Sequence, residues 1–181
     1  MIEARVFLDS LDNARKVLGE QKAELKGKYK IHDTIYRNKD KNISLTDEFL
    51  RLRVIPENIW DEKEVILALK QTNLHAVGKD SHIPLKLQFD TREQAQAYYE
   101  GNLKNTYVLD FDFWRIGWQY FLPNGDAIDL EIVEEKYPSI ELKSETDEGM
   151  EKLLALFHIE KESVISGPSV VAVRNLLLIK N

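Results

Sequence analysis

Two arginines on one short segment are the residues with the clearest capacity for chemistry. In residues 49–53, Arg51 and Arg53 alternate with Leu50 and Leu52, a pattern typical of a β-strand with both arginines on one face. The guanidinium fork matches the oxygens of a phosphate or a carboxylate. The pair therefore predicts an anion site, although a half-solvated sheet with no such role would show the same alternation.

Several other segments also have an apolar face opposite a charged one. The charged faces carry Glu3 and Arg5, Lys70, Lys86, Asp129 and Glu131, and Glu141 and Lys143. Taken together, these faces favour a sheet rolled around a charged concave surface or lumen. In such a lumen, basic side chains would hold phosphate oxygens and carboxylates would hold Mg²⁺ or Mn²⁺. Phosphoryl chemistry needs both parts.

Periodicity and turn residues predict the elements that position these side chains. Strands are expected at 2–8, 29–36, 49–55, 64–70, 83–89, 107–122, 128–133 and 140–143, and helices at 9–25, 90–100, 144–158 and from 167 onward. The polar stretches 37–47 and 56–63 are expected to be loops. Pro84 marks its strand as an edge strand or an irregular one, because proline has no N–H to donate. No repeat or linker divides the chain, so a single domain spanning 1–181 is expected.

The composition is that of an ordinary folded domain, with 181 residues of which 43% are hydrophobic. The absence of cysteine excludes disulfides, thiolate metal sites and a cysteine nucleophile. The net charge, 25 − 31 = −6, argues against general nucleic-acid binding but allows a small anion at a local basic cluster. The charged start and the lack of a long apolar run predict a cytoplasmic protein without a membrane segment.

The order of the motifs resembles the CYTH superfamily, the triphosphate tunnel enzymes, which include class IV adenylate cyclases, thiamine triphosphatases and inorganic triphosphatases. Residues 1–5 are similar to the family's E-x-E-x-K strand, and residues 32–36 look like its extended D-x-Y-like strand. Residues 49–53 are similar to its L-R-x-R strand and residues 67–70 to its L-x-L-K strand. Residues 128–131 and 140–143 resemble the late aspartate and E-I-E strands, so the resemblance covers nearly the whole chain.

The resemblance implies an α+β fold, an antiparallel eight-stranded β-barrel (the triphosphate tunnel) with helices packed outside. It implies phosphate binding by Arg5, Arg51, Arg53, Lys70, Lys86 and Arg115, and Mg²⁺ or Mn²⁺ binding by Glu3, Asp129, Glu131 and Glu141. It assigns catalytic roles to Glu3 and Arg53. The implied ligand is a triphosphate-bearing small molecule (inorganic triphosphate, thiamine triphosphate or ATP), and a homodimer is compatible with the resemblance.

Two departures from the family pattern leave the chemistry open. Met1 stands where the family has its first glutamate, and Lys143 places a positive charge where its last metal-binding glutamate is expected. Met1 cannot bind a hard cation as a carboxylate would. The favoured hypothesis is a metal-dependent enzyme that hydrolyses or cyclises its ligand. A binding or sensing module without a complete metal site is the alternative, and a third is a scaffold whose charged faces form internal ion pairs.

Overall fold

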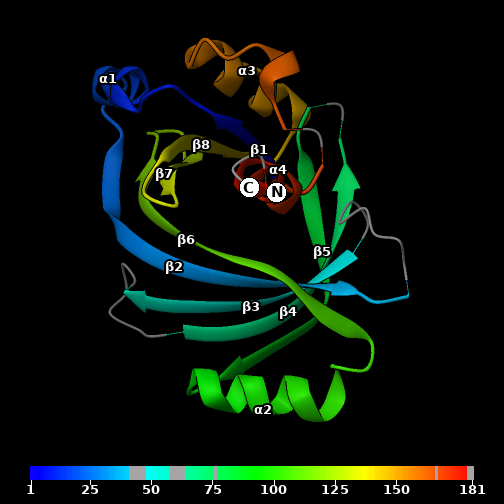
Figure 1. Cartoon of the computed structure of the whole chain (residues 1–181). Coiled ribbons are helices and arrows are strands. Elements are labelled where there is room, and N and C mark those ends of the chain that lie inside the picture. Colours follow the sequence, from blue (N-terminus) through cyan, green and yellow to red (C-terminus); the bar gives the residue numbers. More distant parts are fainter. Residues whose placement is uncertain (41–47, 58–63, 76, 166, 179–181) are drawn as a thin grey trace.

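The computed structural model of the chain describes residues 1–40, 48–57, 64–75, 77–165 and 167–178. Within these residues, eight strands close into an antiparallel barrel in the order β1-β5-β4-β3-β2-β6-β7-β8 (Figure 1). The strands are β1 (Ile2–Phe7), β2 (Glu24–Asn38), β3 (Glu48–Glu57), β4 (Glu64–Leu74), β5 (Lys79–Phe89), β6 (Tyr107–Phe121), β7 (Ala127–Val133) and β8 (Tyr137–Ser144). This is the α+β barrel that the sequence predicts.

Three helices cover the outside of the barrel: α1 (Asp12–Glu20), α2 (Arg92–Asn102) and α3 (Asp147–Leu156). Thr91 begins α2, its side chain accepting a hydrogen bond from the backbone N–H of Gln94, and Thr146 caps α3 in the same way. α2 packs on the apolar face of β3 and β4, while α1 and α3 share a core with β1, β7 and β8. The outer apolar faces are thereby buried, which leaves the charged faces pointing inward. No helix in the described part of the chain combines the length and apolar character needed to cross a membrane.

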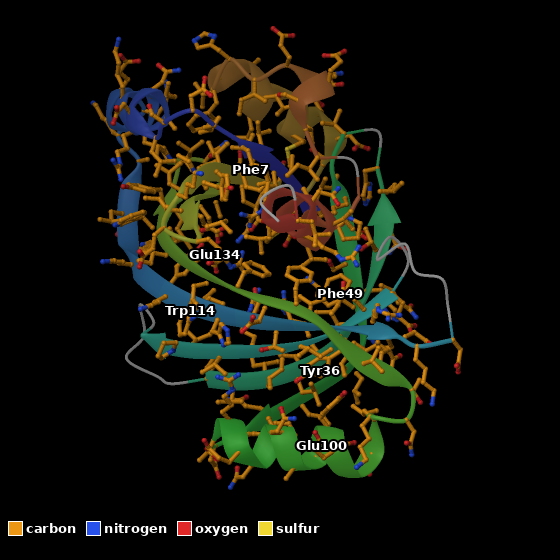
Figure 2. All side chains as sticks on the ribbon, in the orientation of Figure 1. Phe7, Tyr36, Phe49, Glu100, Trp114 and Glu134 are labelled. Carbon is orange, nitrogen blue, oxygen red and sulfur yellow. The ribbon has the colours of Figure 1, made fainter. Side chains whose placement is uncertain are left out.

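The fourth helix, α4 (Ser169–Leu178), lies inside the ring of strands (Figure 1). Val170 and Val173 form an apolar cluster with Phe49, Phe113 and Val133 from the inner faces of β3, β6 and β7. Figure 2 shows Phe49 on the side of the sheet that faces α4 and Tyr36 on the side that faces α2. α4 therefore fills one end of the lumen, whereas the other three helices pack outside as predicted.

Some boundaries differ from those predicted. α1 ends at Glu20 instead of continuing to residue 25, and β2 already begins at Glu24. Residues 24–28 pair with the far end of the aromatic strand β6, and this pairing outweighs the local helical pattern. β5 begins at Lys79 instead of residue 83, and β8 at Tyr137 instead of residue 140. The expected loops at 37–47 and 56–63 lie mostly outside the described residues, and their ends at 37–38 and 56–57 belong to β2 and β3.

Two local features shape the barrel near its charged lining. β1 and β5 meet through a single residue pair, Glu3 and Lys79. Gly78 precedes this pair with φ +84°, and a Cβ there would lie 2.6 Å from the Glu3 carbonyl oxygen, so the close approach requires glycine. The register of β4 and β5 shifts between Leu69 and Gln71, in the part of the ladder that contains Pro84. Pro84 predicts an irregular strand, and the irregularity in the pairing of β4 and β5 is found at Lys70.

A charged tunnel as the candidate functional site

The charged faces of the strands enclose a cavity of about 330 Å³ inside the barrel. Seven basic residues line it: Arg5, Arg51, Arg53, Lys70, Lys79, Arg115 and Lys143. Six carboxylates line it as well: Glu3, Asp33, Glu64, Asp129, Glu131 and Glu141. The period of two within each strand and the closure of the sheet bring these residues together from distant parts of the chain.

The structure brings together all but one of the residues predicted for the site. Lys86 is exposed on β5 and does not line the cavity. Sequence reasoning missed Lys79, because the predicted strand began after it. It also missed Asp33, which lies between Ile31 and Ile35 on a face that looked mainly apolar. The D-x-Y-like motif at residues 32–36 contains Asp33 and was the one sequence signal that could have identified it as a site residue.

Arg5 joins two carboxylates in the half of the tunnel formed by β1, β7 and β8. Its Nη1 donates to Glu131 and, at 3.1 Å, to Ser139, and its Nη2 donates to Glu141 Oε1 at 2.8 Å. The strand register causes this, because Arg5 and Glu141 are direct partners across β1 and β8. Burial favours the neutral form of Arg5, but Glu131 and Glu141 outweigh it and raise the Arg5 pKa well above its usual value.

Glu131 has two further donors, Tyr29 on β2 and Arg115 on the neighbouring strand β6. The Tyr29 hydroxyl donates to Glu131 Oε1 at 2.5 Å, and Arg115 Nη1 donates to the same oxygen at 3.0 Å. The Tyr29 ring lies over Gly117, where a Cβ would clash with it. Burial alone would raise the pKa of Glu131, but Arg115 and Arg5 outweigh this effect and lower it. Glu131 is therefore a fixed anion with its oxygens already engaged.

Asp33 plays a matching role for the arginines of β3 and β6. Arg53 donates Nε and Nη2 to its two oxygens at 2.7 and 2.9 Å, and Arg115 Nη2 lies 3.2 Å from Oδ2. Burial favours the neutral acid, but Arg53, Arg115 and Arg51 together hold the pKa of Asp33 well below its usual range. The Asp33 carboxylate therefore fixes the orientation of the Arg53 guanidinium group and neutralises its charge.

Lys143 lies among the carboxylates of β7 and β8. Its Nζ is 2.5 Å from Asp129 Oδ2 and 3.7 Å from Glu141 Oε2, and its side chain is 17% exposed. Burial would lower the pKa of Lys143, but Glu141 and Asp129 raise it above its usual value. The ammonium group is therefore a permanent cation between these two acids.

This arrangement does not fit a divalent metal. Within the described residues, no three His, Cys, Asp or Glu side chains are grouped so that they could hold a metal ion. The predicted ligands Asp129, Glu131 and Glu141 each have a lysine or arginine within ion-pair distance. Glu3 lines the cavity from β1, but it makes no ion pair with a described residue. A metal ion would have to displace Lys143 or Arg5 from these carboxylates.

The opposite half of the tunnel, from β3, β4 and β5, holds three cations besides the paired Arg53. Among the described residues, two of them, Lys70 and Lys79, have no carboxylate within ion-pair distance, and the third, Arg51, has only a long contact. Arg51 Nε is buried without a hydrogen bond, and its nearest carboxylate oxygen, in Asp33, is 3.8 Å away. Burial and Arg53 lower the pKa of Arg51 to about 9, and burial and Arg51 lower that of Lys70 to about 7. Lys79 Nζ donates to the hydroxyl of Ser169 at the start of α4, 3.1 Å away. This cationic half can accept an anion.

Proteins of known structure share the fold of this chain. No family model matches the chain, and no curated protein matches it. Among solved structures, the chain is similar to the PH1819 protein from Pyrococcus horikoshii, with a TM-score of 0.71 and 23% identity over 99% of this chain and 97% of that one. It is also similar to HpAC1, a candidate adenylyl cyclase from Hippeastrum, with a TM-score of 0.62 and 20% identity over 96% of this chain and 94% of that one. A candidate adenylate cyclase from Bacillus halodurans has a TM-score of 0.61 and 13% identity over 94% of this chain and 95% of that one.

These likenesses and the strand order define the class of structure, a closed eight-stranded antiparallel barrel. The fold that the resemblance to the CYTH superfamily implied is confirmed. The electrostatics add a division of the lumen into an ion-paired half on β1, β7 and β8 and a cationic half on β3, β4 and β5.

Proposed function

We propose that this protein binds a small molecule bearing a triphosphate, such as inorganic triphosphate, thiamine triphosphate or ATP, in the cationic half of its tunnel. The observation that carries the proposal is a group of three basic residues, Arg51, Lys70 and Lys79, on one side of the cavity. Among the described residues, Lys70 and Lys79 have no carboxylate within ion-pair distance, and Arg51 has only Asp33, at 3.8 Å. Phosphate oxygens would supply the missing partners, since they accept hydrogen bonds from guanidinium and ammonium groups.

Charge counting supports an anionic ligand. Four of the lining carboxylates, Asp33, Asp129, Glu131 and Glu141, are paired with Arg53, Lys143, Arg5 and Arg115, so this network has a net charge of 4 − 4 = 0. The remaining lining residues with Asp, Glu, Lys or Arg side chains are three basic residues and two carboxylates, Glu3 and Glu64, with a net charge of 3 − 2 = +1 when all three bases are protonated. The site is therefore cationic even though the whole chain has a net charge of −6.

Each basic residue has a distinct part in binding. Arg51 would donate its fork to the outer oxygens of a phosphate, and Lys70, a point charge on a flexible stem, would follow the chain of phosphates. Arg53 is oriented by Asp33 and borders the same space. Lys79 would bring the phosphates close to Ser169 at the start of α4.

Turnover of the ligand is the second candidate function. HpAC1, which shares the fold, is described as having a dominant triphosphatase activity. Against metal-assisted turnover in this chain stands the engagement of the carboxylates by Lys143 and Arg5. We therefore favour the binding or sensing module over the enzyme. The catalytic roles of Glu3 and Arg53 stay predictions.

Calorimetric titration with inorganic triphosphate, thiamine triphosphate and ATP tests the proposal. Arg51→Ala should weaken binding at least about 30-fold, because it removes a charge-assisted pair from a buried site. Arg92→Ala on the exposed first turn of α2 is the matched control and should leave binding unchanged.

Release of phosphate, pyrophosphate and cyclic nucleotide should be measured on the same samples with and without Mg²⁺ or Mn²⁺. Binding without release supports the module, whereas metal-dependent release that Arg51→Ala abolishes supports the enzyme. If none of the three ligands binds, the proposed function is wrong.

A further inference from the structure

Lys143 lies on a face of the barrel wall that also carries acidic residues of β7, β8 and β1. Asp129 and Glu141 are direct partners across β7 and β8, and Glu3 and Lys143 are direct partners across β1 and β8. Positions 141 and 143 lie on the same face of β8 because successive side chains alternate. The side chain at position 143 is therefore bordered by three acids, Glu3, Asp129 and Glu141, and its ammonium group contacts two of them.

The acids around Lys143 would have an excess of negative charge without it. Among the described residues, Lys143 is the one cation within ion-pair distance of Asp129, and it also contacts Glu141. The second oxygen of Asp129, Oδ1, is buried without a hydrogen-bond partner. Lys143 supplies the cation beside Asp129 and Glu141.

We propose that Lys143 is a built-in cation that takes the place of a divalent metal, so that the tunnel binds its phosphate ligand in the metal-free form. The part of this inference that concerns the metal stands on the geometry of β7 and β8 alone. The part that concerns the ligand rests on the proposed function. A free triphosphate presents all its charge to the cations of the tunnel, whereas a magnesium chelate has part of its charge neutralised and some oxygens already engaged.

The proposal predicts the gain of a metal site by a single substitution. Lys143→Glu would replace the ammonium group by a carboxylate beside Asp129, Glu141 and Glu3. The substitution would add a fourth carboxylate to this face, and Mg²⁺ and Mn²⁺ prefer carboxylate oxygens as ligands. Lys143→Gln removes the charge and adds none, which exposes the existing acids to a metal ion.

Calorimetric titration with Mn²⁺ in the absence of any phosphate tests this directly. The wild-type protein should show no binding up to about 1 mM, whereas Lys143→Glu should bind with a dissociation constant on the order of 0.1 mM or tighter. Lys152→Glu makes the same charge change on the exposed face of α3 and should behave as the wild type does. Mn²⁺ should also raise the melting temperature of Lys143→Glu and leave that of the wild type unchanged.

Several outcomes would overturn the proposal. Mn²⁺ binding by the wild type in the micromolar range would show that Lys143 does not exclude a metal. Equal, weak binding by folded wild-type and Lys143→Glu proteins would show that the acids do not converge on this point. If Lys143→Glu does not fold, Lys143→Gln decides instead, with at least about a fivefold gain in Mn²⁺ affinity expected and no gain counting against the proposal.

In a second experiment, the wild-type protein is titrated with inorganic triphosphate, once in the presence of a metal chelator and once in excess Mg²⁺. Binding should be at least about threefold tighter with the chelator, because Mg²⁺ competes for the phosphate oxygens. A requirement for Mg²⁺ would refute the proposal. Absence of binding in both conditions would refute the proposed function instead, and the Mn²⁺ titration would still decide the role of Lys143.

Discussion

Lys70 should make the binding of a phosphate ligand depend on pH. Burial and the neighbouring Arg51 and Arg53 lower its pKa to about 7, and Glu3 and Glu141 oppose this only in part. About half of the unliganded molecules therefore lack this charge near neutral pH. Phosphate oxygens beside the amine would restore its usual pKa, so binding should take up a proton at pH values above about 7.

The size of the effect follows from the fraction of protein with the charge. With a pKa of about 7, Lys70 is charged in about half of the molecules at pH 7 and in about one in a hundred at pH 9. The apparent affinity of a ligand that needs the charged form should therefore fall about 50-fold over this range. Lys70→Arg should greatly reduce the dependence, because a guanidinium group holds its proton to a higher pH than an amine does in the same surroundings.

Calorimetric titrations with inorganic triphosphate at constant ionic strength, from about pH 6 to about pH 9, test this. The ratio of the wild-type and Lys70→Arg dissociation constants is the decisive quantity, because ionisation of the ligand itself cancels in it. This ratio should rise about 50-fold between pH 7 and pH 9. A ratio that stays constant within about twofold would refute the reasoning, since Lys70 would then have the same charge with and without ligand.

Three further substitutions test the scaffold by urea unfolding. Asp33→Asn should destabilise the protein by about 3 kcal/mol, because it leaves Arg53 and Arg115 without their shared anion. The Asp33 carboxylate has a lowered pKa, so the stability that it adds is present above the usual aspartate range and lost as pH falls; Asp33→Asn should lose that acid dependence. Gly78→Ala should cost about 2 kcal/mol, since its Cβ would press on the Glu3 carbonyl where the barrel closes. Leu142→Ala in the outer core should cost about 2 to 5 kcal/mol, and a cost below about 1 kcal/mol would contradict its complete burial.

The inward direction of most site residues could be predicted because it depends on local alternation alone. Glu3 and Arg5 face the lumen because Ile2, Ala4 and Val6 are the apolar set that must be covered by helices. The same argument places Arg51 and Arg53 opposite Leu50 and Leu52, which pack on α2.

The pairing of charges inside the tunnel could not be predicted in this way. Whether Arg5 meets Glu141 or another acid is set by the register of β1 and β8, and nothing in either strand alone encodes that register. Lys79 was missed for a related reason. It pairs with Glu3 of β1, 76 positions away in the sequence (79 − 3), and with Leu74 of β4. Residues 79–82 are all polar, so no apolar alternation marks them as part of a strand.

The position of α4 shows another limit of local patterns. Its valines predict a packed helix, which is correct, but apolar side chains are equally suited to the outer and the inner side of a barrel. Only the closed structure shows that Val170 and Val173 meet Phe49 and Phe113 from inside. The apolar residues on the inner faces of β3 and β6 form the surface on which α4 packs.

Internal ion pairing, the scaffold hypothesis, explains one half of the lumen and fails for the other. A barrel kept only for its stability would gain from an apolar residue in place of Arg51, because a buried cation with one long carboxylate contact, 3.8 Å to Asp33, and no hydrogen bond at Nε is costly. Arg51→Met should therefore stabilise the unliganded protein by on the order of 1 kcal/mol and abolish phosphate binding. Arg53→Met should instead destabilise it by about 2 kcal/mol or more, because it takes the two-point donor away from the buried Asp33. Urea unfolding with triphosphate titration distinguishes the hypotheses: if both substitutions destabilise the protein equally, Arg51 has a structural role and is not held ready for a ligand.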